Sequence, residues 1–94
     1  LLAKELMAKL VNAYVRYQGA SERAEIYSKK ILPQMSQYSS AAINEYSNDS
    51  GDFTEVVRSE IALLDAKITL LKIKVSKRKA LAEIHYFLPL EFKH

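Results

Sequence analysis

The sequence predicts an all-α protein, a long antiparallel hairpin in which two helices pack as a coiled coil. Two long stretches repeat apolar residues at alternating intervals of three and four, and one sustained polar break separates them. Helices over residues 4–46 and 53–88 would be roughly 60 Å and 50 Å long at about 1.5 Å per residue. Helices of that length cannot fold back into a compact globule within 94 residues, so an extended hairpin remains.

The break between the helices is the predicted tip, residues 47–52, with one aromatic residue on each side. Tip and flanks together are Tyr46, Ser47, Asn48, Asp49, Ser50, Gly51, Asp52 and Phe53. Serine, asparagine and aspartate side chains compete for backbone groups, and asparagine, aspartate and glycine tolerate positive φ. The first helix is therefore expected to stop near Ser47. The two flanking aromatic rings are expected to pack together across the turn.

The start of the second helix is predicted from the spacing of two carboxylates. Asp52 stands three residues before Glu55. At this spacing an N-cap side chain accepts a hydrogen bond from the third amide of the helix, and the carboxylate of the third residue reaches back to the cap. The sequence therefore predicts a capping box, with a second helix that begins at about Phe53 and ends near Leu88.

The first helix carries one seam of apolar and small residues. Its members are Leu6, Leu10, Ala13, Tyr17, Ala20, Ala24, Tyr27, Ile31, Met35, Tyr38 and Ala42. Two steps of four meet around Pro33, which locally relaxes left-handed supercoiling. A proline inside a helix costs about 3 kcal/mol, yet the seam continues on both sides of it, which predicts a kink and not a break.

The second helix carries two rows of apolar residues. The more regular row forms a seam of Val57, Ile61, Leu64, Ile68, Leu71 and Val75. A further row lies mostly beside it and consists of Val56, Leu63, Leu70, Ile73, Leu81, Ile84 and Leu88. This apolar surface is broader than one partner helix covers, so the second helix is expected to pack on two sides.

Composition and charge exclude several classes of site. The chain has no cysteine, which excludes disulfides and thiolate metal sites, and its net charge of +3 is mild. The basic residues of the second helix are Lys67, Lys72, Lys74, Lys77, Arg78 and Lys79. They spread around the helix without interleaved aromatic residues, which favours a solvated face or salt bridges to a neighbouring subunit over nucleic acid. We expect no cofactor, no metal site at His85 or His94, and no enzymatic activity, because the sequence has no catalytic constellation or phosphate-binding loop.

A series of residues around the tip follows a specific order. A Leu-Pro-Gln step precedes a tyrosine by thirteen residues, and a glycine-containing turn, an Asp-Phe pair and a Val-Val opening of the next helix follow. The positions are Pro33, Tyr46, Gly51, Asp52, Phe53, Val56 and Val57. In order and spacing this stretch resembles the C-terminal hairpin of TolC-type outer-membrane efflux proteins, with the greatest similarity to the heavy-metal cation efflux branch. The resemblance covers roughly residues 24–88, where Ala-Leu-Ala-Glu-Ile at 80–84 is similar to the end of that family's last helix.

One position departs from the pattern of that family. The family usually has glycine three residues after the tyrosine, and this chain has Asp49 there. Aspartate occupies a left-handed conformation at some energetic cost, and Gly51 is expected to share that conformation.

The resemblance implies a structural role in transport. In that family three subunits build a periplasmic α-barrel beneath an outer-membrane β-barrel, and the hairpin tips meet a periplasmic adaptor fed by an inner-membrane pump. The chain would then be one periplasmic hairpin of a homotrimeric channel in the outer membrane of a Gram-negative bacterium, cut from a longer subunit. The residues Tyr46 to Phe53 would dock the adaptor, and the pump would be an indirect partner.

Four carboxylates near the tip admit two interpretations. Glu45, Asp49, Asp52 and Glu55 have Arg58 as the only nearby cation. They form either an acidic docking end for basic adaptor residues or a set of helix-capping groups that favour the helix dipole, and the two roles are compatible. The alternative for the whole chain is a coiled-coil scaffold or adaptor-type interaction module without a channel role.

Overall fold

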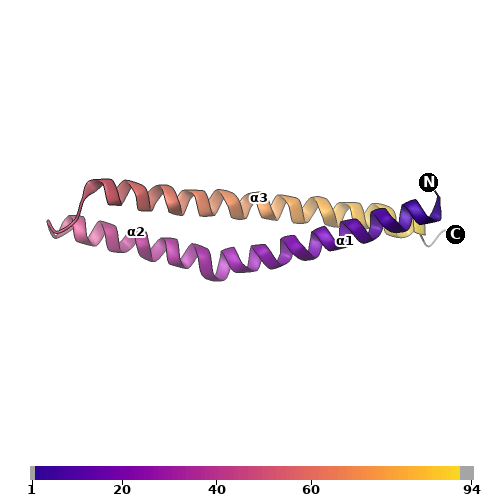
Figure 1. Ribbon diagram of the computed structural model, residues 1–94, viewed down its shortest axis with the longest axis horizontal. Helices are drawn as coiled ribbons and strands as arrows, with labels where there is room; N and C mark the ends of the chain where they lie inside the picture. Colours follow the sequence, from indigo (N-terminus) through magenta and orange to yellow (C-terminus); the bar gives the residue numbers. More distant parts are fainter. Residues whose placement is uncertain (1, 92–94) are drawn as a thin grey trace. The chain divides into compact units, whose positions relative to one another are not determined.

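The computed structural model describes residues 2–91, and its fold is an all-α helical hairpin with no strand in that range. The elements are the α-helix α1 (Ala3–Ile26), the π-helical segment η1 (Tyr27–Ile31), and the α-helices α2 (Leu32–Ser47) and α3 (Phe53–Glu91) (Figure 1). Because α1, η1 and α2 follow one another without a gap, they form the first predicted helix, and α3 forms the second. The predicted all-α hairpin is confirmed.

Within this hairpin the chain divides into two compact units. The terminal unit comprises Leu1–Ala24 and Lys72–His94, and the tip unit comprises Glu25–Leu71. By sequence the terminal unit has ten lysines and arginines against four acidic residues, a net charge of +6, whereas the tip unit has four against seven, a net charge of −3. The net charge of the whole chain is small because the positive charge of one unit is partly offset by the negative charge of the other.

The irregularity expected at Pro33 is a π-helical turn immediately before it. The backbone N–H of Leu32 donates to the carbonyl of Tyr27, five residues earlier. In a regular α-helix the ring of Pro33 would clash with the carbonyl of Lys29, and the wider π-turn relieves that clash. The helix therefore passes through the proline without a break, although Pro33 donates no backbone hydrogen bond to the preceding turn.

In the terminal unit, α1 packs antiparallel to the second part of α3 through small residues. Ala13 and Ala80 are both 0% exposed, and Ala20 and Leu6 are also buried. Alanine at these positions lets the helix axes approach closely. Around this contact the ammonium of Lys77 lies 5.5 Å from the centre of the Tyr17 ring.

In the tip unit, α2 and the first part of α3 lie side by side after the turn (Figure 1). The buried residues of this unit include two serines, Ser39 and Ser59, together with Ala42, Ala66 and Leu70. The hydroxyl of Ser39 donates to the carboxylate of Glu60 on the other helix. The hydroxyl of Ser59 donates to the carbonyl of Val56 on its own helix at 2.8 Å. Both buried hydroxyls are therefore hydrogen-bonded, as burial requires.

The two apolar rows of α3 have different environments. The less regular row contributes part of the covered surface, with Leu70 and Ile73 buried and Val56, Leu63 and Ile84 half-buried, whereas its members Leu81 and Leu88 are exposed. The more regular row is exposed from Val57 (39%) to Leu71 (63%), and its full membership is Val57, Ile61, Leu64, Ile68, Leu71 and Val75. We call its members within the tip unit, Val57, Ile61, Leu64, Ile68 and Leu71, the outer stripe.

The end of α3 lies later than the sequence predicts. The helix passes through Pro89 and ends at Glu91, whereas an end near Leu88 was expected. A proline this close to a helix end removes a single backbone hydrogen bond in the last turn, so its cost is smaller than in a helix interior.

Candidate functional site: the hairpin tip

The first half of the tip is a Schellman motif at the end of α2. Asp49 has φ 59°, and its N–H donates to the carbonyl of Tyr46 at 3.1 Å. The N–H of Ser50 donates to the carbonyl of Glu45 at 3.0 Å, and the Ser50 hydroxyl donates to the same oxygen at 3.2 Å. These bonds satisfy two of the last carbonyls of the helix, and they need one residue in the left-handed conformation. Asp49 occupies the place that glycine usually takes in this motif.

Gly51 is required for a different reason from the one expected. It does not have a positive φ, so the expectation that it shares the left-handed conformation with Asp49 is wrong. A β-carbon at position 51 would lie 2.7 Å from the backbone nitrogen of Tyr46 and 2.8 Å from the carbonyl carbon of Glu45. The chain returns so closely over the end of α2 that only glycine fits.

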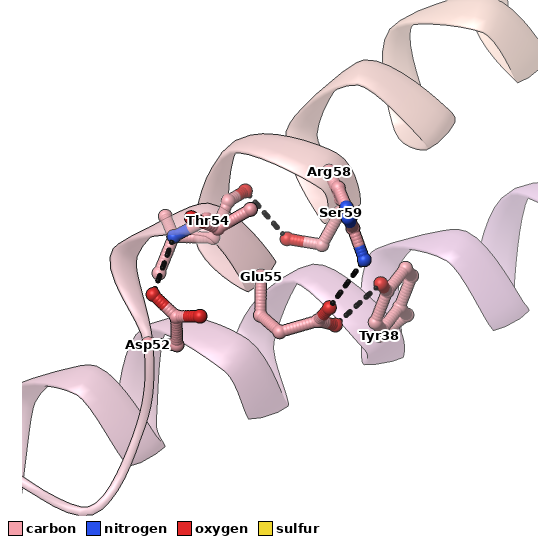
Figure 2. A network of polar contacts seen from close by, with 7 residues as sticks. Tyr38, Asp52, Thr54, Glu55, Arg58 and Ser59 are labelled. Atoms are coloured by element: carbon pink, nitrogen blue, oxygen red, sulfur yellow. Dashed lines mark hydrogen bonds and ion pairs between the residues drawn. The ribbon is translucent and has the colours of Figure 1, made fainter.

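The second half of the tip is the N-terminus of α3, where Asp52 is the N-cap. Its Oδ1 accepts a hydrogen bond from the N–H of Thr54 at 3.0 Å (Figure 2). The N–H of Glu55 donates instead to the backbone carbonyl of Asp52 at 3.1 Å. The predicted capping box is therefore wrong in both of its bonds, although the helix does begin at Phe53.

The Glu55 carboxylate is turned toward α2, which explains why the box does not form. The Tyr38 hydroxyl donates to Glu55 Oε2 at 2.9 Å, and Arg58 Nη1 lies 3.3 Å from Glu55 Oε1 (Figure 2). The hydrogen bond to the carboxylate raises the pKa of Tyr38, with smaller contributions from burial and from the charge of Glu55, while Arg58 opposes the shift. This network ties α2 to the first turn of α3.

The two aromatic residues that flank the turn are in contact. The ring centres of Tyr46 and Phe53 are 5.7 Å apart with the planes inclined at 54°. This tilted arrangement is one that aromatic pairs favour, and it confirms the expected contact across the turn. Both side chains are also about half exposed, so the pair presents apolar surface to the outside.

The remaining tip residues are solvent-exposed. Ser47, Asn48 and Ser50 are exposed, and so are the carboxylates of Glu45, Asp49 and Asp52. None of these three carboxylates forms an ion pair within the described part of the chain. Of the four carboxylates expected to cluster at the tip, three are therefore exposed and without an ion pair in this range. The fourth, Glu55, accepts hydrogen bonds from Tyr38 and Arg58.

Sequence reasoning missed the polar residues that join the two helices beside the tip. Tyr38 belongs to the predicted apolar seam, but it is 37% exposed and donates a hydrogen bond through its hydroxyl, while the adjacent Ser39 is buried. A buried serine cannot be predicted from the spacing of apolar residues, because serine is not counted among them. On α3 the same holds for Ser59, which continues the spacing of three and four from Val56 to Leu63 and is buried.

Among residues 2–91 no group of three or more histidine, aspartate or glutamate side chains is placed to hold a metal ion. His94 lies outside the described residues. None of the helices in the described range combines the length and the apolar character that crossing a bilayer requires. No protein-family model matches the chain, and comparisons with curated proteins and with solved structures found no match.

Proposed function

We propose that this chain is a periplasmic hairpin of an outer-membrane efflux channel subunit, where it forms part of the wall of a helical tunnel and docks a periplasmic adaptor through its tip. Its role is structural and recognitional, and it has no catalytic part. The parent protein assembles as a homotrimer, and heavy-metal cations are the proposed cargo. The sequence resemblance motivates the efflux assignment, and the geometry of α3 and of the tip supports it.

The outer stripe is the observation that carries this proposal. Its residues follow one another at steps of three and four, from Val57 to Leu71, so they lie on one face of α3. All five are exposed, although neighbouring residues on the adjacent face of the same helix are covered, with Leu70 buried and Val56 and Leu63 half-buried. A regular apolar stripe of this kind fits a second helix in knobs-into-holes packing. A hairpin with a second seam of this kind is suited to stand beside other hairpins in a wall.

A hollow on the same face provides a place for such packing. It has a volume of about 280 Å³ and is lined by Glu60, Ile61, Leu63, Leu64 and Lys67. Three of the lining side chains are apolar, one is negative and one is positive. A neighbouring helix that inserts an apolar side chain here therefore also meets both signs of charge, which favours one register over others.

The tip supports the docking part of the proposal. It offers an exposed aromatic pair, Tyr46 and Phe53, surrounded by three carboxylates without ion-pair partners in the described range. Aromatic side chains are enriched at protein interfaces, and carboxylates without partners favour a partner surface of opposite charge. The expected partner surface is basic and contains an apolar pocket.

Site-specific crosslinking in the parent protein tests the two surfaces separately. A photoreactive residue replaces Leu64 on the outer stripe or Asn48 at the tip, in the full-length protein within its native envelope. We expect Leu64 to crosslink to another helical hairpin of the channel and Asn48 to crosslink to a periplasmic adaptor. A crosslink from Leu64 shows that the photoreactive residue works in this protein, so that a lack of crosslinks from Asn48 can be interpreted.

The outcomes separate a channel from a scaffold. If Leu64 crosslinks to another hairpin while Asn48 crosslinks only to cytosolic proteins or to nothing, the chain is a coiled-coil scaffold and the efflux proposal fails. If Leu64 crosslinks to no second helix, the outer stripe is not an assembly surface.

A further inference from the structure

The terminal unit contains a groove whose polar lining consists of hydrogen-bond donors. It has a volume of about 460 Å³ and is lined by Val15, Arg16, Gly19, Arg23, Ser76 and Lys79. The first four residues lie on α1 and the last two on α3. Three of the six side chains are cationic and none is acidic, although glutamate is present elsewhere in the unit.

Gly19 lines this groove and leaves space in it because glycine has no side chain. It lies between Arg16 and Arg23 on the same face of α1, because the spacings of three and four place residues on one side of a helix. The point where a β-carbon at position 19 would stand is 3.4 Å from Nη1 of Arg23, so the guanidinium lies over the glycine. A larger side chain at position 19 would occupy this space. The glycine therefore has a steric role, since a helix interior otherwise disfavours it.

The cations of the groove differ in what neutralises them. Arg16 pairs with Glu83 and also donates to Oδ1 of Asn12 at 2.8 Å. Arg23 and Lys79 form no ion pair within residues 2–91. Two uncompensated cations therefore face the groove, in a unit whose net charge is already +6. Their mutual repulsion would be relieved by a bound anion.

We propose that this groove binds a phosphate group. The guanidinium of Arg23 offers a planar pair of N–H donors, the ammonium of Lys79 a mobile positive charge and Ser76 a hydroxyl, which together match a tetrahedral oxyanion with several acceptor oxygens. The phosphate belongs either to a free anion or to the headgroup of an anionic phospholipid. This inference is independent of the proposed tunnel-wall role, since it uses none of the outer-stripe or tip residues.

Nuclear magnetic resonance titration of the 94-residue chain tests the site. Inorganic phosphate is added at constant ionic strength, and the signals of the Gly19 amide, the Ser76 amide and the Arg23 side-chain N–H are followed. We expect saturable shifts at these groups, and Arg23→Gln or Lys79→Gln to weaken binding roughly tenfold, because each removes one charge-assisted hydrogen bond. Vesicles of phosphatidylcholine with and without phosphatidylglycerol distinguish a headgroup from the free anion.

Two variants control for charge and for folding. Lys74→Gln removes the same charge from an exposed position of α3 outside the groove and is expected to leave phosphate binding unchanged. Gly19→Leu keeps every cation but fills the groove, so it is expected to abolish binding while the unfolding midpoint does not fall, since leucine is the better helix former.

The proposal is overturned by either of two results. One is that neither phosphate nor anionic vesicles perturb the groove signals. The other is that Lys74→Gln weakens binding as much as Arg23→Gln, which would reduce the effect to the general positive charge of the unit.

Discussion

The terminal unit and the tip unit pack their helices with different small residues. In the terminal unit the covered small residues are alanines, with Ala13 and Ala80 fully buried. In the tip unit two of the covered residues are serines, and Ser59 is also 0% exposed. The alanines need no partner, whereas each serine hydroxyl requires an acceptor, which Glu60 or the carbonyl of Val56 provides. The contact in the tip unit therefore depends on polar geometry as well as on shape.

The same comparison explains where the apolar surface of α3 remains open. Because serine and alanine occupy covered positions of the tip unit, many of the larger apolar side chains of that stretch lie on the outer stripe. In the terminal unit α3 also exposes apolar side chains, among them Val75 and Tyr86, but it carries in addition the exposed cations Lys72, Lys74, Arg78 and Lys79. One helix thus presents a regular apolar stripe in the tip unit and a mixed apolar and cationic surface in the terminal unit.

The largest effect is expected from Gly51→Val in the tip unit. A β-carbon at this position would lie within 2.8 Å of backbone atoms of Glu45 and Tyr46, which belong to α2 and do not move easily. We expect a loss of about 3 kcal/mol in the free energy of unfolding, measured by urea denaturation.

The other glycine of the chain is the matched control. Gly19→Ala in the terminal unit places a β-carbon at an ordinary contact distance of 3.4 Å from Arg23. It is expected to stabilise α1 by up to about 1 kcal/mol, because alanine is the better helix former. Equal losses from the two substitutions would contradict the steric argument for position 51.

A smaller effect is expected from Asp52→Ala, which removes the side-chain cap of α3. The N–H of Thr54 loses its acceptor, so the free energy of unfolding is expected to fall by about 1 kcal/mol. Asp52→Asn keeps a capping oxygen and is expected to remain within a few tenths of a kcal/mol of the parent. A thermal or urea melt in which the alanine variant matches the parent would show that the cap contributes nothing.

Asp49→Gly is expected to raise stability slightly. The residue has φ 59°, a conformation that costs an L-residue energy and glycine very little. The gain is partly offset by the greater freedom of glycine in the unfolded chain, so about 0.5 kcal/mol is expected. An appreciable fall of the melting midpoint would mean that the Asp49 side chain stabilises the Schellman motif.

The smallest effect is a difference in pH dependence produced by Tyr38→Phe. The pKa of Tyr38 is raised by its hydrogen bond to Glu55, so the stabilisation is fully present below the unfolded-state pKa of about 10. It is lost as the pH rises through the higher folded-state value. The parent is therefore expected to be more stable than the variant at neutral pH and to lose that advantage in alkaline solution. A stability difference that stays constant through this range would contradict the role of the hydrogen bond.

The sequence predicted the elements more successfully than their contacts. The boundaries at Ser47 and Phe53 depend on local chemistry, namely turn-forming side chains and an N-cap aspartate, which act within a few residues. The covered face of α3 was predicted only in part, because the two rows predicted for this helix contain large apolar residues alone and omit the buried Ser59 and Ala66. Contacts between residues far apart in the sequence could not be predicted either. The sequence offers Asp52 as a capping partner for Glu55, but Glu55 instead accepts a hydrogen bond from Tyr38, seventeen residues away.

The two faces of α3 are tested most directly by neighbouring substitutions, Leu70→Ala and Leu71→Ala. Leu70 is 7% exposed and Leu71 is 63% exposed. The measurement is the unfolding midpoint of each variant as a function of protein concentration. We expect Leu70→Ala to lose about 2 kcal/mol at every concentration, because it empties part of the covered contact. Leu71→Ala is expected to match the parent when dilute but to lose the concentration-dependent gain that association through the outer stripe gives the parent. A loss of stability from Leu71→Ala as large as that from Leu70→Ala, independent of concentration, would contradict the assignment of the two faces.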